Sequence, residues 1–211
     1  MQTVSAAFDA PYWQARYATP GRTQWDAGCI TPPLRAYIDQ LPAGAQPRIL
    51  IPGAGRAYEA EYLHRRGFRH VVVADLAPAP LADLAARVPD FPAENLWLTD
   101  FFALDTTEQF DLLLEQTFFC ALAPAQRPAY AQQCAHLLRP GGRLVGLLFE
   151  TEFTGAIEPP FGGTRAEYRA YFEPYFSFIH FDTATNSLPA RRGRELFIEL
   201  LNRPTLNRTS C

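Results

Sequence analysis

The sequence predicts an α/β fold: a doubly wound, mostly parallel seven-stranded sheet with an antiparallel edge strand. From Arg48 onward, short apolar runs alternate with helical stretches, which is typical of a parallel sheet covered on both faces. Two further apolar runs flank a polar, arginine-rich turn near the end, as in a hairpin. The length of 211 residues fits one compact domain. We therefore expect a single domain over 1–211, with an N-terminal lid or cap segment at 1–47, a core at 48–202 and a tail at 203–211.

The first half of the core alternates strand and helix twice. Residues 48–52 (RILIP) predict a buried strand that ends in a turn. Residues 56–66 predict a helix with Leu63 on its apolar face and Glu59 on its polar face. The valine-rich run at 70–75 predicts the second strand, and 81–88 predicts a short helix that a proline closes.

The second half continues the alternation. Residues 95–99 and 111–115 predict the third and fourth strands, and 124–138 predicts a helix with proline near its start. The fifth strand is expected at 143–149, after a Pro-Gly-Gly sequence. A helix at 165–171 then precedes two strands, at 175–182 and 195–201, that we expect to form the hairpin.

Composition excludes several classes of protein. A hydrophobic fraction of 48% and a charged fraction of 19% allow a sizeable core and argue against a disordered chain. The longest apolar runs are far shorter than the roughly 20 residues that cross a bilayer, so we expect no membrane span. The N-terminus has neither a basic start nor an apolar centre, so we expect no signal peptide. The net charge of −3 argues against a nucleic-acid partner.

The four cysteines are scattered and predict neither a disulfide framework nor a metal site. Cys29, Cys120, Cys134 and Cys211 form no CxxC pair and have no histidine at ligand spacing. Thiols without partners suit a reducing compartment, and we expect a cytoplasmic location.

A glycine-rich turn is the sharpest local motif. Gly53-Ala54-Gly55 follows the first predicted strand and opens a helix. Glycine permits the tight turn and lets a ligand approach the backbone, while the N–H groups at the helix start are unpaired. A turn with nothing bound is the alternative, because this motif alone is a weak signal.

Asp75 strengthens the case for a ligand. It ends the second predicted strand, 22 residues after Gly53, and an acid about 20 residues after the glycines grips the hydroxyl groups of a ribose. A solvated aspartate or a helix cap is the alternative for this residue alone.

The ligand is expected to be a nucleoside without phosphates. The third glycine of the dinucleotide fingerprint is missing, and the bulky Arg56 stands where a pyrophosphate would lie. S-adenosylmethionine has a ribose and an adenine but no phosphate. Asp100 can accept from the adenine amino group while Phe101 packs on the base, although a helix cap and a core position are the alternatives.

These candidate segments fall at equivalent places in the predicted sheet. The glycine turn, Asp75, residues 100–102 and residues 116–119 all follow the carboxyl ends of strands. Parallel sheets bind their ligands beyond these ends, so we expect the four segments to converge on one site.

The sequence resembles the thiopurine and thiol/halide methyltransferase family over roughly residues 8–200. The first half of the resemblance lies at 12–17 (YWQARY), 21–28 (GRTQWDAG), 31–33 (TPP) and 52–59 (PGAGRAYE). The second half lies at 117–124 (TFFCALAP), with Arg127 and Tyr130 after it, and at 159–161 (PPF).

The resemblance implies a Rossmann-like class I methyltransferase that uses S-adenosyl-L-methionine and releases S-adenosyl-L-homocysteine. It implies that Trp13 and Trp25 flank the methionine end of the cofactor and that Arg127 orients the acceptor. The remaining implied cofactor contacts are Gly53 and Gly55 for the methionine end, Asp75 for the ribose, Asp100 and Phe101 for the adenine, and Gln116, Thr117 and Phe118 for the methionine side. Cys29 departs from the charged residue of many relatives, which leaves the acceptor open.

The acceptor is expected to be a small soft nucleophile: a thiol, a thiopurine or a related sulfur, selenium or halide compound. A thiol keeps a few per cent of thiolate at pH 7, so a strong general base is not obligatory. Two alternatives are a small-molecule O- or N-methyltransferase, which would need Asp26 or Glu150 as a base, and a cofactor-binding protein without catalysis. A nicotinamide oxidoreductase fits less well. The sequence leaves the oligomeric state open and is compatible with a monomer.

Overall fold

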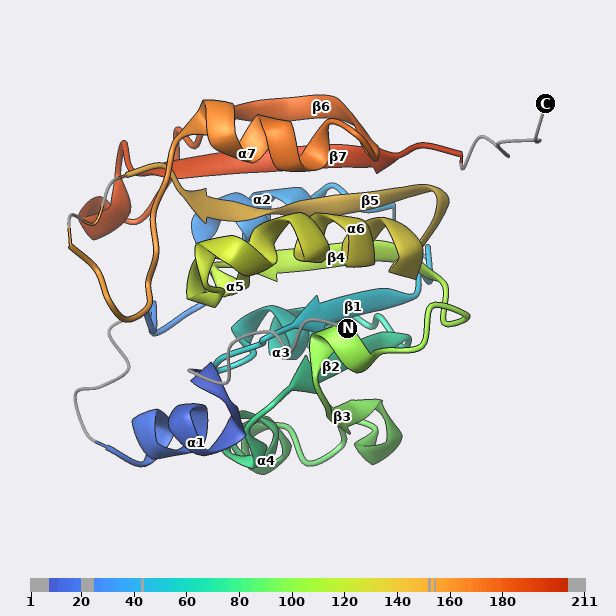
Figure 1. Cartoon of the computed structure of the whole chain (residues 1–211). Helices are drawn as coiled ribbons and strands as arrows, with labels where there is room; N and C mark the ends of the chain where they lie inside the picture. The colour runs from blue at the N-terminus through green and yellow to red at the C-terminus, as the bar shows by residue number, and fades with distance from the viewer. Residues whose placement is uncertain (1–7, 20–24, 43, 152, 154, 205–211) are drawn as a thin grey trace.

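The computed structural model describes residues 8–19, 25–42, 44–151, 153 and 155–204. A seven-stranded sheet runs through the molecule in the order β3-β2-β1-β4-β5-β7-β6 (Figure 1). The strands are β1 (Ile49–Pro52), β2 (Val71–Asp75), β3 (Leu96–Leu98), β4 (Phe110–Gln116), β5 (Leu138–Phe149), β6 (Phe176–Thr183) and β7 (Glu195–Asn202).

The predicted fold class is confirmed. Strands β1 to β5 pair in parallel, and β7 pairs antiparallel with both β5 and β6. The predicted hairpin therefore forms, with β7 inserted between β5 and the edge strand β6. This order places the chain crossover between β1 and β4, at the centre of the sheet.

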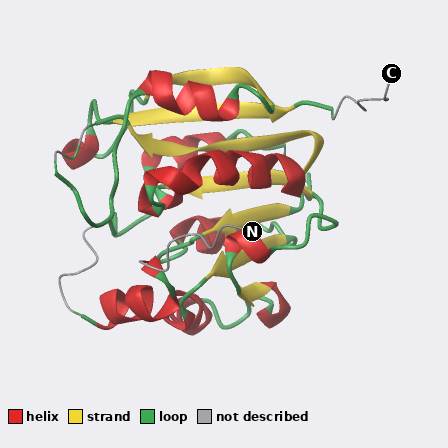
Figure 2. Cartoon of the chain, viewed as in Figure 1, coloured by secondary structure: helices red, strands yellow, loops and turns green. Residues whose placement is uncertain are grey.

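Helices cover both faces of the sheet (Figure 2). Leu50 packs on one face with residues of α6 (Arg127–Leu137) and α7 (Arg165–Phe172). Ile49 and Ile51 pack on the other face with residues of α2 (Pro32–Asp39), α3 (Tyr58–Arg65) and α4 (Pro78–Arg87). This alternation along β1 is the two-residue period of a strand that is buried on both sides. The helices are α1 (Ala10–Ala18), α2 (Pro32–Asp39), α3 (Tyr58–Arg65), α4 (Pro78–Arg87), α5 (Phe118–Ala121), α6 (Arg127–Leu137) and α7 (Arg165–Phe172), with short 3-10 turns at Ala93–Asn95, Phe101–Ala103, Pro124–Gln126 and Pro189–Arg191.

The segment before the core contains two helices. Helix α1 begins after Asp9, whose carboxylate accepts from the Tyr12 N–H at 3.0 Å and caps the helix. Gln14 of α1 accepts from the Ala79 N–H at 3.3 Å and so joins α1 to the start of α4. The stretch at 20–24, which belongs to the 21–28 motif, and the tail beyond 204 lie outside the described residues.

The fifth strand is longer than expected. It begins at Leu138, so the Pro-Gly-Gly sequence lies inside the strand and not in a loop before it. The register against β4 shifts between Phe110 and Leu112, and Gly142 packs closely on the backbone oxygens of Arg139 and Phe110. A bulge of this kind tolerates glycine and proline where a regular ladder would not.

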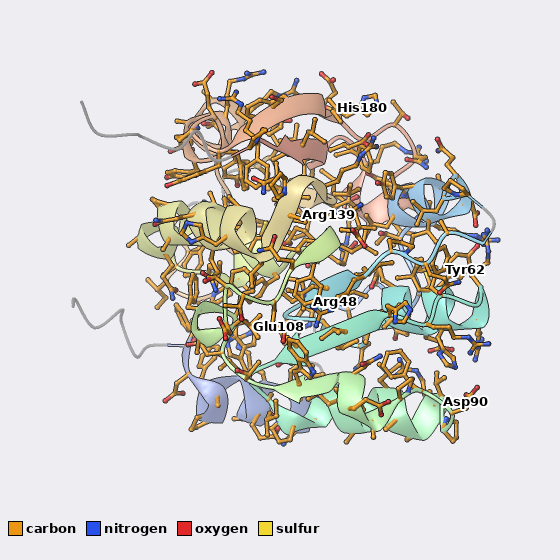
Figure 3. The ribbon with its side chains drawn as sticks, turned by 90° about the vertical axis from the view of Figure 1, so that its right-hand side faces the viewer. Arg48, Tyr62, Asp90, Glu108, Arg139 and His180 are labelled. Carbon is orange, nitrogen blue, oxygen red and sulfur yellow. The ribbon has the colours of Figure 1, made fainter. Side chains whose placement is uncertain are left out.

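The edge of the sheet where the parallel strands begin carries surface ion pairs. Arg48 pairs with Glu108, and Arg139 pairs with Asp111 at 2.6 Å (Figure 3). The opposite edge, where these strands end, holds the segments that the sequence singled out. None of the described helices is long and apolar enough to cross a membrane.

Candidate active site

A cavity of about 260 Å³ lies at the carboxyl ends of the parallel strands. It is lined by the loops that follow β1 to β4, by α1 and by residues near Trp25. All ten residues predicted to bind the cofactor line it: Trp13, Trp25, Gly53, Gly55, Asp75, Asp100, Phe101, Gln116, Thr117 and Phe118. Residues far apart in the sequence thus meet because parallel strands deliver their loops to the same edge.

The glycine turn has the backbone that only glycine adopts readily. Gly53 and Gly55 have φ values of +54° and +55°. A Cβ at Gly53 would overlap the ring of Phe118, whereas a Cβ at Gly55 would meet Trp25 Nε1 only at 3.8 Å. Gly53 thus lets the aromatic ring after β4 lie directly against the turn after β1.

We expect Gly53→Ala to weaken binding of S-adenosylhomocysteine at least tenfold, because the new methyl group must displace Phe118 inside the cavity. Gly141→Ala is the matched control: its φ is +78°, nothing lies within 4 Å of the added Cβ, and it is outside the cavity. Both variants carry the left-handed strain of roughly 1–2 kcal/mol, so both should lose thermal stability. Equal affinities of the two variants in titration calorimetry would contradict the steric argument.

Asp75 ends β2 and is a buried residue of the cavity lining. The side chain accepts from the Ala77 N–H at 2.9 Å, and the residue is only 7% exposed. Burial raises the pKa of this carboxyl from 3.8 to about 6, although neighbouring backbone N–H groups, including that of Gly55, oppose the shift. The helix-cap alternative and the ligand prediction are compatible here, because the carboxylate accepts from the Ala77 N–H and the residue still lines the cavity.

Ligand binding through Asp75 is expected to depend on pH. The ionised carboxylate accepts hydroxyl hydrogens best, so affinity for 5′-methylthioadenosine should fall as the pH drops below about 6, by up to tenfold per unit. The raised pKa also means that the folded chain binds more protons than the unfolded chain between about pH 4 and 6. Asp75 therefore lowers the free energy of unfolding as the pH rises through that window. Titrations from pH 4.5 to 8 test this, and Asp75→Asn should abolish the dependence; a flat wild-type profile would refute it.

The residues after β3 combine a helix cap with an aromatic surface. Asp100 accepts from the Phe102 N–H at 2.9 Å and so caps the 3-10 turn at Phe101–Ala103. Phe101 is buried, with its ring edge-on to Phe118 at 5.6 Å between centroids. Asp100 is thus a helix cap and Phe101 a core residue, as the alternatives proposed. Both residues also line the cavity, so the adenine contact stays a prediction.

Aromatic rings from the N-terminal segment form one wall of the cavity. Trp13 and Trp25 meet edge-to-face at 5.7 Å, and Tyr17 meets Trp25 at 5.8 Å. Arg191, which precedes β7, donates to the Trp25 carbonyl and ties this segment to the C-terminal hairpin. Burial raises the pKa of Tyr17, so its ring is neutral at physiological pH. The faces of such rings attract cations, including a sulfonium.

The residues after β4 carry an unsatisfied donor. Gln116 Oε1 accepts from Thr31 Oγ1 at 2.8 Å, while Gln116 Nε2 is buried and has no partner in the described part of the chain. Thr117 has a φ of +61° and begins the short helix α5. Beneath this turn the buried Glu115 accepts from the Phe119 N–H at 3.1 Å and from the Tyr130 hydroxyl at 2.7 Å. Burial raises the pKa of Glu115 to about 7.

Arg127 is the one predicted site residue that lies apart from the cavity lining. It is 3% exposed, and its guanidinium donates to the carbonyls of Phe161 at 2.7 Å and Gly162 at 2.9 Å. It also stacks over the ring of Phe119 at 4.6 Å. These contacts hold the loop whose Pro159 and Pro160 line the cavity. The predicted contact between Arg127 and the acceptor stays a prediction.

Glu59 lines the cavity although the sequence patterns did not predict it as a site residue. We expected it on the polar face of its helix, but it is 3% exposed and lines the cavity from the first turn of α3. Burial raises the pKa of its carboxyl from 4.5 to about 7. The helical period of α3 predicted this face to be exposed. The burial of Glu59 comes from α2 and the segment around Thr31, which are distant in the sequence and pack over that face. Phe149, which also lines the cavity, gave no local signal of a ligand contact, whereas Asp26, a predicted candidate base, does line the cavity.

The lining fits S-adenosyl-L-methionine. It offers a buried carboxylate for the ribose, an orphaned buried amide donor at Gln116, aromatic rings for a cation and a turn without a Cβ at Gly53. Arg56, which would face a pyrophosphate, is engaged by Asp26 at 3.4 Å and by Asp83. The lining is thus suited to a phosphate-free adenosyl ligand.

Solved structures with this fold bind the same kind of cofactor. A 1,6-didemethyltoxoflavin N1-methyltransferase from Burkholderia thailandensis, solved with S-adenosylhomocysteine, matches with a TM-score of 0.72 and 19% identity over 97% of this chain and 94% of its own. The N-methyltransferase NodS from Bradyrhizobium japonicum, also solved with S-adenosylhomocysteine, has a TM-score of 0.68 and 17% identity over 92% and 98% of the two chains. The fold of this chain is therefore that of class I S-adenosyl-L-methionine-dependent methyltransferases.

The sequence comparisons give the family. The model of the thiopurine S-methyltransferase family matches residues 8–202. A probable thiol methyltransferase 2 of Arabidopsis thaliana is 33% identical over 191 residues, which cover 87% of this chain and 79% of that protein. A thiopurine S-methyltransferase of Legionella pneumophila is 30% identical over 141 residues, 59% of this chain and 63% of that protein. The chain belongs to the thiopurine S-methyltransferase family, as the resemblance of its motifs predicted.

Proposed function

We propose that the protein methylates a small sulfur nucleophile, a thiol or thiopurine or a related soft acceptor. The observation that carries this proposal is the apolar share of the cavity lining, which includes Phe8, Leu122, Phe149 and Pro160. The names of the relatives, which include thiol, thiocyanate and thiopurine methyltransferases, support the same class.

The candidate bases for oxygen or nitrogen methylation are occupied. Asp26 accepts from the Gly28 N–H at 2.8 Å and pairs with Arg56. Glu150 accepts two hydrogen bonds of 2.9 Å from Arg165 and does not line the cavity. A thiol, part of which is ionised at neutral pH, needs no such base.

Ten residues would hold the cofactor. Asp75 binds the ribose hydroxyls, Asp100 and Phe101 the adenine, and the remaining residues surround the methionine end: Trp13, Trp25, Gly53, Gly55, Gln116, Thr117 and Phe118. When bound, S-adenosyl-L-methionine supplies a methyl group on a cationic sulfur. The aromatic wall of Trp13 and Trp25 stabilises positive charge and excludes water, and the apolar lining favours a poorly solvated soft nucleophile. Arg127 contributes by holding the loop at 159–162 and, in this proposal, orients the acceptor from there.

Residues 1–47 are the proposed lid of the single domain, with 48–202 as its core and 203–211 as a tail. Trp13 and Trp25 support this division, because they reach the cavity from outside the sheet. The Arg191 bond to the Trp25 carbonyl fastens the lid to the core.

A monomeric enzyme in the cytoplasm, acting on a small molecule and not on nucleic acid, completes the proposal. Cys29, Cys120 and Cys134 are free thiols, which suits a reducing compartment. The net charge of −3 supports a small-molecule acceptor over a polyanion.

The test is a transfer assay with methyl-labelled S-adenosyl-L-methionine. The acceptor panel contains hydrosulfide, an aromatic thiol, 6-mercaptopurine, thiocyanate and iodide, with a catechol and a primary amine as oxygen and nitrogen acceptors. We expect labelled product from at least one sulfur acceptor and none from the catechol or the amine. Cofactor binding without transfer to any acceptor would indicate a non-catalytic binding protein, and methylation of the catechol or amine alone would overturn the acceptor class.

A further inference from the structure

A buried carboxylate without a cationic partner in the described residues lines the cavity. Glu59, in the first turn of α3, is 3% exposed and lines the cavity. In the described part of the chain, no arginine or histidine nitrogen lies within 4.0 Å of its carboxylate oxygens. Only backbone N–H groups, of Thr31 and of Glu59 itself, stabilise the charge directly.

The arginine that attracts Glu59 through space is engaged elsewhere. Arg191 attracts the Glu59 carboxylate through space, but its guanidinium pairs with Glu195 at 3.3 Å and donates to the Trp25 carbonyl. A buried charge without a partner is costly, so a residue of this kind points to a cation that the protein itself does not supply.

The other carboxylates of the described cavity lining already have hydrogen-bond or ion-pair partners. Asp75 accepts from the Ala77 N–H and is the proposed ribose contact, and the remaining three also have donors or cations. Asp9 caps α1, Asp26 pairs with Arg56, and Asp100 caps the turn after β3. Glu59 is the remaining acidic group.

Glu59 lies beside an unsatisfied amide donor. Thr31 connects the two groups: its N–H stabilises the Glu59 carboxylate and its hydroxyl donates to Gln116 Oε1 at 2.8 Å, which leaves Gln116 Nε2 buried and without a partner in the described residues. An anionic acceptor and an amide donor held together in this way match the ammonium and carboxylate groups of an α-amino acid.

The position of this pair in the sheet also fits. Gln116 ends β4 and Glu59 follows the turn after β1, so they lie at the β1–β4 crossover, while Asp75 lies at the end of β2 on the other side of β1. With the ribose at Asp75 and the adenine at Asp100 and Phe101 after β3, the methionine portion of the ligand would extend from Asp75 toward β4.

We propose that Glu59 is the binding residue for the α-ammonium group of the cofactor's methionine portion, with Gln116 Nε2 donating to the α-carboxylate. The inference rests on the assignment of S-adenosyl-L-methionine as cofactor. Glu59 would then let the site distinguish the complete cofactor from adenosyl fragments that lack the amino-acid tail.

Titration calorimetry with three ligands tests the proposal. S-adenosylhomocysteine carries the tail, 5′-methylthioadenosine lacks it, and an analogue of S-adenosylhomocysteine with hydrogen in place of the α-amino group lacks only the ammonium. We expect Glu59→Gln to weaken S-adenosylhomocysteine about 10- to 100-fold and to change the other two ligands less than threefold. The wild-type protein should bind the deaminated analogue about 10- to 100-fold more weakly than S-adenosylhomocysteine, a comparison that needs no variant to fold.

Glu61→Gln is the matched control. Glu61 lies on the same helix but pairs with Arg65 at 2.7 Å and with Arg87 at 2.9 Å, outside the cavity. This variant should bind all three ligands as the wild type does.

Other outcomes overturn the inference. Equal weakening of 5′-methylthioadenosine and S-adenosylhomocysteine by Glu59→Gln would show that Glu59 maintains the cavity and does not read the ammonium. Unchanged affinity of Glu59→Gln for S-adenosylhomocysteine would also refute it. So would equal affinity of the wild-type protein for S-adenosylhomocysteine and the deaminated analogue. Wild-type protein that binds none of the ligands would instead overturn the cofactor assignment itself.

Discussion

Asp75→Ala is expected to weaken S-adenosylhomocysteine binding by about 100-fold or more. A carboxylate that receives two ribose hydroxyls makes two charge-assisted hydrogen bonds, each contributing about 1.5–3 kcal/mol, and every 1.4 kcal/mol is tenfold in affinity. Burial strengthens the effect, because Asp75 is 7% exposed and water cannot replace the missing oxygen atoms easily. Titration calorimetry and the ligand-induced rise in melting temperature measure the loss.

Asp90→Ala is the control for the loss of an acidic side chain. Asp90 is exposed and pairs with His64 at 3.0 Å, away from the cavity (Figure 3). Its variant should bind the ligand normally. If the Asp75→Ala protein folds and binds S-adenosylhomocysteine within threefold of the wild-type affinity, the assignment of Asp75 to the ribose is wrong.

Glu115→Ala is expected to lower the free energy of unfolding by about 3–5 kcal/mol. The side chain is fully buried and accepts hydrogen bonds from the Phe119 N–H and the Tyr130 hydroxyl. Its removal leaves two buried donors without an acceptor, each costing about 1–3 kcal/mol, and opens a cavity in the core. Stabilities of small proteins are only about 5–15 kcal/mol, so this is a large fraction of the total.

Two further variants separate the causes. Tyr130→Phe removes one donor and keeps the acceptor, so a smaller loss of about 1–2 kcal/mol is expected from urea unfolding. Glu108→Ala removes a glutamate whose partner is Arg48 on the surface (Figure 3), and should cost less than about 1 kcal/mol. A Glu115→Ala protein as stable as the Glu108→Ala protein would refute the assigned role.

The role of Glu115 also bears on the site. Its bonds fix the start of α5, and with it Thr117 in the left-handed conformation and Phe118 against Gly53. We therefore see the buried carboxylate as the support of the turn that closes the cavity after β4.

Local patterns in the sequence determined the fold and many of the residues that line the candidate cavity. Apolar runs of strand length alternating with helical periods fixed the element order, and elements that alternate in this way can bury both faces of a sheet only in a doubly wound arrangement. The convergence of Gly53, Asp75, Asp100 and Gln116 followed, because parallel strands all end at the same edge. These residues could be predicted because their positions depend on where strands end, which the sequence shows locally.

The tertiary structure alone decided the roles of residues whose environment is built by distant segments. Glu59 is buried because the segment around Thr31 packs over α3, and Arg127 lies outside the cavity lining because the carbonyls of Phe161 and Gly162, more than 30 residues away, take up its guanidinium. Burial and hydrogen-bond partners are properties of the packed chain. They change the pKa and the role of a side chain, and the local sequence pattern around that residue does not show the change.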